Sequence, residues 1–271
     1  MVRFVGLLAG LLALSGPAWA QRTPPPDRAG DAYELTLRIR SESLSSDGSS
    51  SLSNSGGTLV ERVLATRPDG LELEFDLPAD ATPDERAREW QWPARVFWSK
   101  TATPVLLNGA ELEQRLDAWL TVAEIPREAC DQWFFSWAAF KIECDPESVL
   151  ELLTAYDLRS RLDGAGAGST EGSTMVETAL DPEQVRRERA ESDRVVAEIT
   201  GEDPLTFEQA LAARASEQIA GTETVTREID AEGRPVRQVR TVRLEITTAD
   251  GAVEQNTTTQ TLTRTPLPAP R

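Results

Sequence analysis

The 271-residue chain carries a formal net charge of −17 and contains no histidine. A surplus of acidic residues disfavours nucleic acids and anionic membrane surfaces, which attract basic patches. The lack of histidine excludes Ser-His-Asp and Cys-His catalysis, H-E-x-x-H metalloproteases and nearly all catalytic zinc sites, and no motif in the sequence predicts another metal or a cofactor.

The start of the chain has the pattern of a secretory signal, which we place at residues 1–20. Arg3 precedes an apolar run from Phe4 to Leu14, and Ala18-Trp19-Ala20 is typical of a signal-peptidase site. The run is shorter than the roughly 20 residues of a membrane-spanning helix, so we expect cleavage between Ala20 and Gln21 and no transmembrane segment in the mature chain. Basic residues that are nearly all arginine indicate a GC-rich Gram-negative genome, so we expect a soluble periplasmic protein.

The mature chain is long enough for one large domain or two small ones, with a hydrophobic core. Its composition, with 39% hydrophobic and 27% charged residues over the whole sequence, is that of a globular protein. We expect a proline-rich leader at residues 21–30, a single α+β domain at residues 31–265 and a flexible tail at residues 266–271.

The first predicted strand follows the leader, where apolar residues alternate with polar ones from Tyr33 to Ile39. Residues 41–57 contain nine serines, and this composition predicts a solvated loop or linker. Two further strands are predicted at residues 58–66 and 71–78, because the turn sequence Arg67-Pro68-Asp69-Gly70 separates two apolar segments.

Capping patterns predict the helices of the middle segment. Thr82-Pro83-Asp84-Glu85 is a capping box with proline at the first helical position. Asn108 is expected to cap a second helix, whose predicted buried residues are Leu112, Leu116, Trp119 and Leu120. Between these helices, residues 90–98 predict an edge or bulged strand, because Pro93 cannot donate a ladder hydrogen bond.

Further helices are predicted from Asp145 to Tyr156, from Asp181 onward and from Thr206 to Ile219, whereas the glycine-rich residues 163–172 predict a loop. The chain then ends in a predicted three-stranded meander within residues 221–265. Strands at both ends with helices between them indicate an α+β fold: a bent antiparallel sheet built from the N-terminal strands and the C-terminal meander, with several helices between them.

Cys130 and Cys144 are the two cysteines of the chain. In an oxidising compartment they predict a structural disulfide, and two thiolates without histidine make a poor zinc site. A disulfide excludes one continuous helix between them, because its Cα atoms lie within about 7 Å. A hairpin centred near Trp137 satisfies this constraint and is slightly favoured over a short helix through Trp133 and Phe134.

Three segments together resemble an uncharacterised family of exported Gram-negative proteins: DLPADATPDERAREWQWPARVF, LLNGAELEQRLDAWL and FKIECDPESVLELLTAYDLRS. The resemblance covers residues 30–265 and implies export and a single domain, but no activity. An exported antiparallel sheet interrupted by helices is also similar to the half-barrels that carry lipoproteins or lipids across the periplasm. This second comparison is an analogy of architecture and not a shared motif.

Two functions from different classes remain. The first is a non-catalytic periplasmic binding or envelope-accessory protein, whose bent sheet holds an apolar ligand, a lipid or an envelope partner. Its candidate ligand-binding residues are Trp90, Trp92, Trp98, Trp133 and Trp137, although the same side chains would equally fill a dry core. The alternative is a histidine-free hydrolase with paired carboxylates, but the acidic residues mostly occupy solvated strand and helix faces, so no catalytic residue is predicted.

Overall fold

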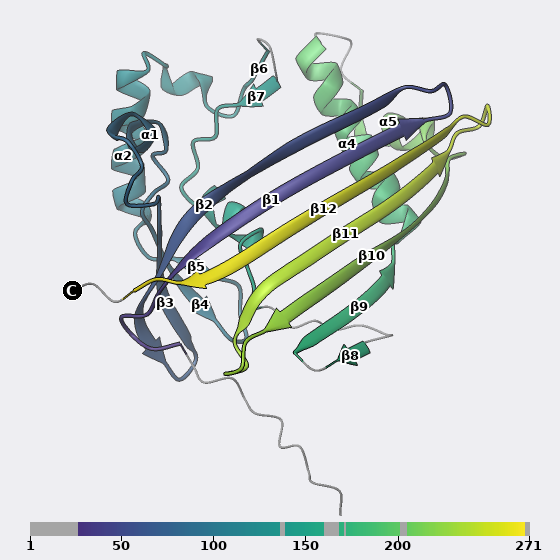
Figure 1. Ribbon diagram of the computed structural model, residues 1–271. Coiled ribbons are helices and arrows are strands. Elements are labelled where there is room, and N and C mark those ends of the chain that lie inside the picture. The colour runs from purple at the N-terminus through teal and green to yellow at the C-terminus, as the bar shows by residue number, and fades with distance from the viewer. Residues whose placement is uncertain (1–26, 136–138, 160–167, 171, 201–204, 269–271) are drawn as a thin grey trace, which may run out of the picture.

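The computed structural model describes residues 27–135, 139–159, 168–170, 172–200 and 205–268. Its main element is a ten-stranded antiparallel sheet in the order β5-β4-β3-β2-β1-β12-β11-β10-β9-β8. The sheet is bent and does not close, since β5 and β8 lie at opposite edges (Figure 1). The first and last strands pair antiparallel from Tyr33 opposite Pro266 to Ser45 opposite Glu254. The predicted α+β class, with the two ends of the chain in one sheet, is therefore confirmed.

Each half of the sheet comes from one end of the chain. The N-terminal half contains β1 (Ala32–Ser45), β2 (Ser50–Arg67), β3 (Gly70–Asp76), β4 (Ala94–Ser99) and β5 (Val105–Leu106). The C-terminal half contains β8 (Gly168–Thr170), β9 (Ser173–Ala179), β10 (Gln218–Ile229), β11 (Pro235–Thr247) and β12 (Val253–Pro266). The predicted meander corresponds to β10, β11 and β12.

The serine-rich segment forms strands, so the predicted loop at residues 41–57 is wrong. β1 continues to Ser45 and β2 begins at Ser50, which leaves residues 46–49 for the turn. β12 pairs with the whole outer part of β1 and presents a run of threonines to it. Strand propensity depends strongly on such neighbours, and here the hydrogen-bond ladder outweighs the weak preference of serine for strands.

Two further differences concern the segment before the meander. Gly168–Thr170 forms β8 within the predicted loop, while residues 163–167 and 171 lie outside the described residues. β9 was not predicted, and it pairs with β10 through Val176 opposite Val225. The helix predicted from Thr206 to Ile219 ends at Ala213, because the chain enters β10 at Gln218.

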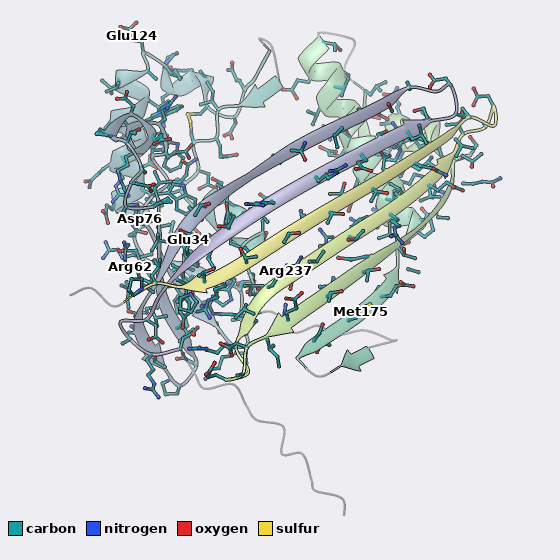
Figure 2. All side chains as sticks on the ribbon, viewed as in Figure 1. Glu34, Arg62, Asp76, Glu124, Met175 and Arg237 are labelled. Atoms are coloured by element: carbon teal, nitrogen blue, oxygen red, sulfur yellow. A yellow bond between two sulfur atoms is a disulfide. The ribbon has the colours of Figure 1, made fainter. Side chains whose placement is uncertain are left out.

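The helices are α1 (Pro83–Arg88), α2 (Gly109–Val122), α3 (Ser148–Thr154), α4 (Pro182–Thr200) and α5 (Phe207–Ala213), with a short 3₁₀ turn at Arg127–Ala129. The expected capping box at Thr82 is present, and Thr206 forms a second capping box at the start of α5. Figure 1 shows α4 and α5 behind the sheet, and α1 and α2 beside its β3–β5 end. Glu34, Arg62 and Arg237 point toward the viewer from the opposite, outer face of the sheet (Figure 2).

Asn108 occupies the N-cap position of α2, but its side chain makes no capping hydrogen bond. Its Oδ1 instead accepts a hydrogen bond from the Arg95 backbone N–H at 2.8 Å, and its Nδ2 donates to the Pro93 carbonyl at 3.0 Å. The predicted cap is therefore wrong in its hydrogen bond and right in its position. Asn108 ties the start of α2 to β4 and to Pro93, the residue that follows the cis Trp92–Pro93 peptide bond.

The hydrophobic core lies over the N-terminal half of the sheet. Leu112, Leu116 and Leu120 of α2 are buried as predicted, and Val149 and Leu153 of α3 join them. They pack with buried strand residues such as Leu35, Leu73, Phe75 and Val96, while Trp119 is partly buried against the same cluster. This core places α3 and the chain before α2 on the inner face of β1 and β2.

The disulfide between Cys130 and Cys144 is present, with a Cα–Cα distance of 5.5 Å. The favoured hairpin is also confirmed, since β6 (Trp133–Phe135) and β7 (Ala139–Lys141) pair antiparallel with Phe134 opposite Phe140. The Asp131 backbone N–H donates to the Ile142 carbonyl at 2.8 Å, which continues the hairpin toward the disulfide. The bridge closes this hairpin four residues before α3, and thus anchors the chain that leads into that helix.

A buried ion-pair network, formed by Asp27, Glu61, Arg159 and Arg264, joins four distant segments. Arg159 donates to both carboxylate oxygens of Glu61, at 2.6 and 2.7 Å, and Arg264 Nη2 donates to Glu61 Oε1 at 2.8 Å. Both arginines also donate to Asp27 Oδ2, at 3.0 and 2.8 Å. The Arg264 guanidinium lies 3.4 Å from the centre of the Tyr33 ring, which adds a cation–π contact.

The network determines the charge state of its members. Burial alone would raise the pKa of Glu61, but the guanidinium groups of Arg159 and Arg264 outweigh it and hold that pKa below 4.5. Burial would likewise raise the pKa of Asp27, but the charges of Arg264 and Arg159 outweigh burial and lower it. Burial, together with the nearby Asp27, raises the pKa of Tyr33 to about 12. Since Arg159 follows α3, the network holds the end of that helix against β2 and β12.

Acid should therefore weaken the fold through this network. A carboxyl group whose folded pKa is lowered stabilises the protein above its unfolded pKa, near 4.5 for Glu61, and this contribution is lost as the pH falls through the folded value. We expect the free energy of unfolding, measured in urea, to fall from about pH 5 downward. In Glu61→Gln the fall should be shallower, whereas the exposed control Glu34→Gln should follow the wild type; parallel wild-type and Glu61→Gln curves would contradict the assignment.

Candidate ligand cavity

A cavity of about 1290 Å³ lies between the inner face of β1 and β2 on one side and the segments around α1 and α3 on the other. The strands contribute Leu37, Ile39 and Leu59. Leu37 and Leu59 are buried and form an apolar floor. These side chains face the cavity because alternate residues of a strand share one face, so the pattern that predicted β1 also places Leu37 and Ile39 here.

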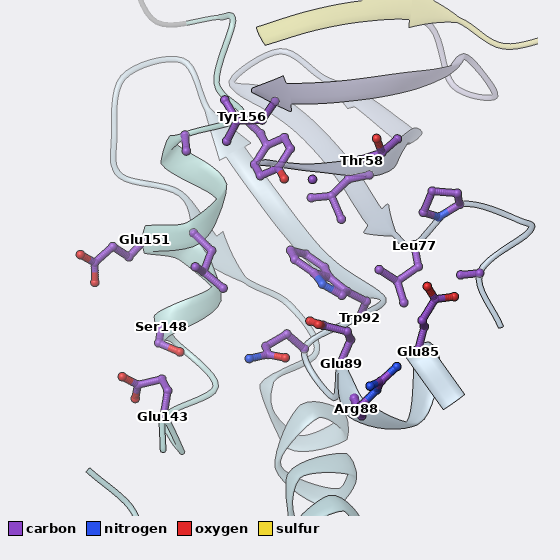
Figure 3. A pocket seen from close by; sticks show the side chains of 18 of the residues that line it. Thr58, Leu77, Glu85, Arg88, Glu89, Trp92, Glu143, Ser148, Glu151 and Tyr156 are labelled. Atoms are coloured by element: carbon purple, nitrogen blue, oxygen red, sulfur yellow. The ribbon is translucent and has the colours of Figure 1, made fainter. Parts of the chain in front are cut away.

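The walls of the cavity are also largely apolar. Leu77 and Trp92 line it from the segments on either side of α1, and Leu152, Ala155 and Tyr156 line it from α3 and the residues after it (Figure 3). Leu152 is 49% exposed, although it is a large hydrophobic residue. This wall therefore exposes apolar surface to water. Small-molecule binding sites are usually lined by apolar side chains of this kind.

Tyr156 places a polar group in this apolar space. Its hydroxyl points into the cavity, toward β2 (Figure 3). A Cβ atom built on Gly57 would lie 2.9 Å from this hydroxyl oxygen, so glycine leaves room for the tyrosine. Burial, and to a smaller extent the charge of Glu89, raises the pKa of Tyr156, so the hydroxyl keeps its proton and can donate a hydrogen bond to a ligand.

Among the described residues, the tryptophans proposed from the sequence lie in different places. Trp92 lines the cavity, as expected for a ligand-binding residue. Trp90 is 4% exposed and belongs to the hydrophobic core, and Trp98 packs on that core with its ring centre 6.2 Å from that of Phe75. Trp133 lies in β6, in a part of the chain whose side chains are not described, and Trp137 lies outside the described residues.

The carboxylates of the described residues bear on the alternative of a paired-carboxylate hydrolase. They contain no group of three or more histidine, cysteine, aspartate or glutamate residues able to hold a metal ion. Asp27 and Glu61 form a buried carboxylate pair, but the pKa values of both are lowered by arginines, whereas the general acid of a glycosidase requires a raised pKa. No helix within the described ranges is long and apolar enough to cross a membrane.

Comparison with known proteins gives no family for this chain. No family model and no curated protein matches it. A solved structure described as "Lipid-protein interactions in lipovitellin" is similar to it, with 6% sequence identity and a TM-score of 0.34. The alignment covers 90% of this chain and 26% of the lipovitellin chain, so this chain spans about a quarter of that length. A likeness at this level carries no inference about what this chain binds.

Proposed function

We propose that this chain is a non-catalytic envelope protein that holds the apolar part of a ligand, such as a lipid, in the cavity between β1, β2, α1 and α3. The apolar lining of this cavity is the observation that carries the proposal. Removing such surface from water stabilises a complex by about 25 cal/mol per Å². The volume of about 1290 Å³ exceeds the roughly 300–1,000 Å³ of most small-molecule sites, which suits an alkyl chain better than a compact metabolite.

The proposed location is the periplasm of a Gram-negative bacterium. The support is in the sequence, where residues 1–20 have the pattern of an export signal and cleavage is expected between Ala20 and Gln21. A disulfide in the folded chain is consistent with an oxidising compartment. In that compartment the available apolar ligands are lipids and the acyl chains of envelope proteins.

A series of alkyl maltosides tests the proposal, since the headgroup is constant and uncharged. Each CH₂ group that enters an apolar site contributes about 0.8 kcal/mol, so affinity should rise roughly tenfold from octyl to decyl and again from decyl to dodecyl. Titration calorimetry with monomeric detergent gives the three dissociation constants. Absence of binding, or affinities that do not depend on chain length, would refute the proposal.

Two pairs of variants test whether the ligand lies in the cavity. Gly57→Leu projects a side chain toward Tyr156 and should weaken dodecyl maltoside binding at least tenfold, whereas Ser53→Leu, on β2 but outside the cavity, should bind as the wild type does. Trp92→Phe should remove most of the change in tryptophan fluorescence on binding, and Trp119→Phe should retain it. Unchanged binding by a folded Gly57→Leu variant would place the ligand elsewhere.

A further inference from the structure

The charged residues around the cavity are strongly unbalanced in sign. Five carboxylates line it, from Asp80, Glu85, Glu89, Glu143 and Glu151, and among the described lining residues Arg88 alone is basic. Asp80, Glu85, Glu89 and Glu151 are exposed, whereas the apolar floor formed by Leu37 and Leu59 is buried. The cavity therefore has an apolar interior and an acidic rim.

The carboxylates come from both walls, so they surround the opening. Glu85 and Glu89 belong to α1 and its C-cap, and Glu143 and Glu151 precede and follow the start of α3 on the other side (Figure 3). Glu85 is occupied by its capping box, where it accepts hydrogen bonds from Thr82. Within the described part of the chain, neither Glu89 nor Glu151 forms an ion pair.

Arg88 offsets the charge of one of these five carboxylates. Its Nε donates to the carbonyl of Asp84 at 3.2 Å, within α1, and its positive charge acts on Glu85. The negative charge of Glu89, by contrast, acts on the interior of the cavity, where it contributes to the raised pKa of the Tyr156 hydroxyl. A cationic group at the rim would be attracted to Glu89 and Glu151, and an anionic group would be repelled by them.

We infer that the ligand of this cavity is a cationic amphiphile, whose alkyl chain lies on Leu37, Leu59 and Trp92 and whose ammonium or guanidinium group lies at the acidic rim. The inference rests on the proposed function and adds the charge of the ligand to it. The apolar lining supplies the binding energy common to all alkyl chains, and the rim discriminates among headgroups. Fatty acids and lipids with a net negative headgroup are disfavoured occupants.

Three dodecyl compounds separate the two claims: dodecyltrimethylammonium, dodecyl maltoside and dodecanoate, each as the monomer. At low ionic strength the cation should bind at least about tenfold more tightly than the maltoside, and dodecanoate should bind most weakly. About 0.5 M NaCl should bring the three affinities closer together, because salt screens exposed charges. If all three compounds bind equally, or dodecanoate binds best, the inference fails while the proposed function stands; if none binds, the proposed function itself fails.

A double variant tests which carboxylates are responsible. Glu89→Gln combined with Glu151→Gln should remove most of the preference for the cation over dodecyl maltoside. The matched control, Glu34→Gln with Glu177→Gln, makes the same change in net charge at two exposed strand positions outside the cavity. It should keep the full preference. A preference that survives in the cavity variant, or disappears equally in the control, would overturn the role of the rim.

Discussion

Glu61→Gln is expected to lower the free energy of unfolding by about 3–5 kcal/mol. The Glu61 side chain is completely buried and accepts hydrogen bonds from both Arg159 and Arg264. Glutamine keeps the shape of the side chain but removes its charge, so two guanidinium groups remain in the protein interior with Asp27 as their common acidic partner. Leaving a buried charge without its partner costs far more than the pair contributes when intact.

Urea unfolding at neutral pH measures this loss. Glu34→Gln is the control on β1, because Glu34 is exposed on the outer face, and it should change stability by no more than about 0.5 kcal/mol. Since Arg159 follows α3, Glu61→Gln should also weaken dodecyl maltoside binding by loosening one wall of the cavity. Equal stabilities for the two glutamine variants would show that the network does not hold the segments together.

Replacing both cysteines by alanine is expected to lower the free energy of unfolding by about 2–4 kcal/mol. The bridge between Cys130 and Cys144 closes a loop of about fifteen residues, which restricts the unfolded chain by about 3 kcal/mol. Neither cysteine lines the cavity, so alkyl maltoside binding should persist in the folded variant. Urea unfolding and calorimetry on the same samples test both parts.

The reduced wild type provides the control for this variant. Without its disulfide it should approach the stability of the double-alanine protein, while the oxidised wild type should show no thiol that can be labelled in the native state. Equal stability of the oxidised protein and the double variant would mean that the bridge adds nothing to the fold. Efficient labelling of the native protein would contradict the disulfide itself.

The sequence predicted those parts of the fold that local patterns determine. Alternation along β1, the capping box at Thr82 and the spacing of Leu112, Leu116 and Leu120 each reflect one element and its nearest neighbours. The outer part of β1 depends instead on β12, more than two hundred residues away, with which it pairs, and the serine-rich start of β2 in turn pairs with β1. A local composition contains no information about such a partner.

The residues of the cavity could be predicted from the sequence only in part, for the same reason. Trp92, a candidate ligand-binding residue from the sequence, lines the cavity, whereas Trp90 belongs to the core. Tyr156 and Gly57 were not proposed, because they meet only in the folded chain. The buried network, by contrast, does have a signal in the sequence, although its acidic residues were assigned to solvated faces. Glu61 follows Leu59 at a spacing of two, which places a charge on the apolar face of its strand and requires a buried partner.

The two edges of the main sheet affect how molecules of this protein meet one another. The outermost strands are short, since β5 has two residues and β8 has three. Within the described residues, however, β3 pairs only with Val60–Arg67 of β2, so Ser50–Leu59 forms a longer edge. Long unpaired edges invite strands of a second molecule to add to a sheet, and short or charged edges prevent such addition. Beyond the reach of β8, the edge of β9 carries the exposed Glu177. The open edge of β2, which carries no charged residue from Ser50 to Leu59, is therefore the place at which a strand of a second molecule would add to this sheet.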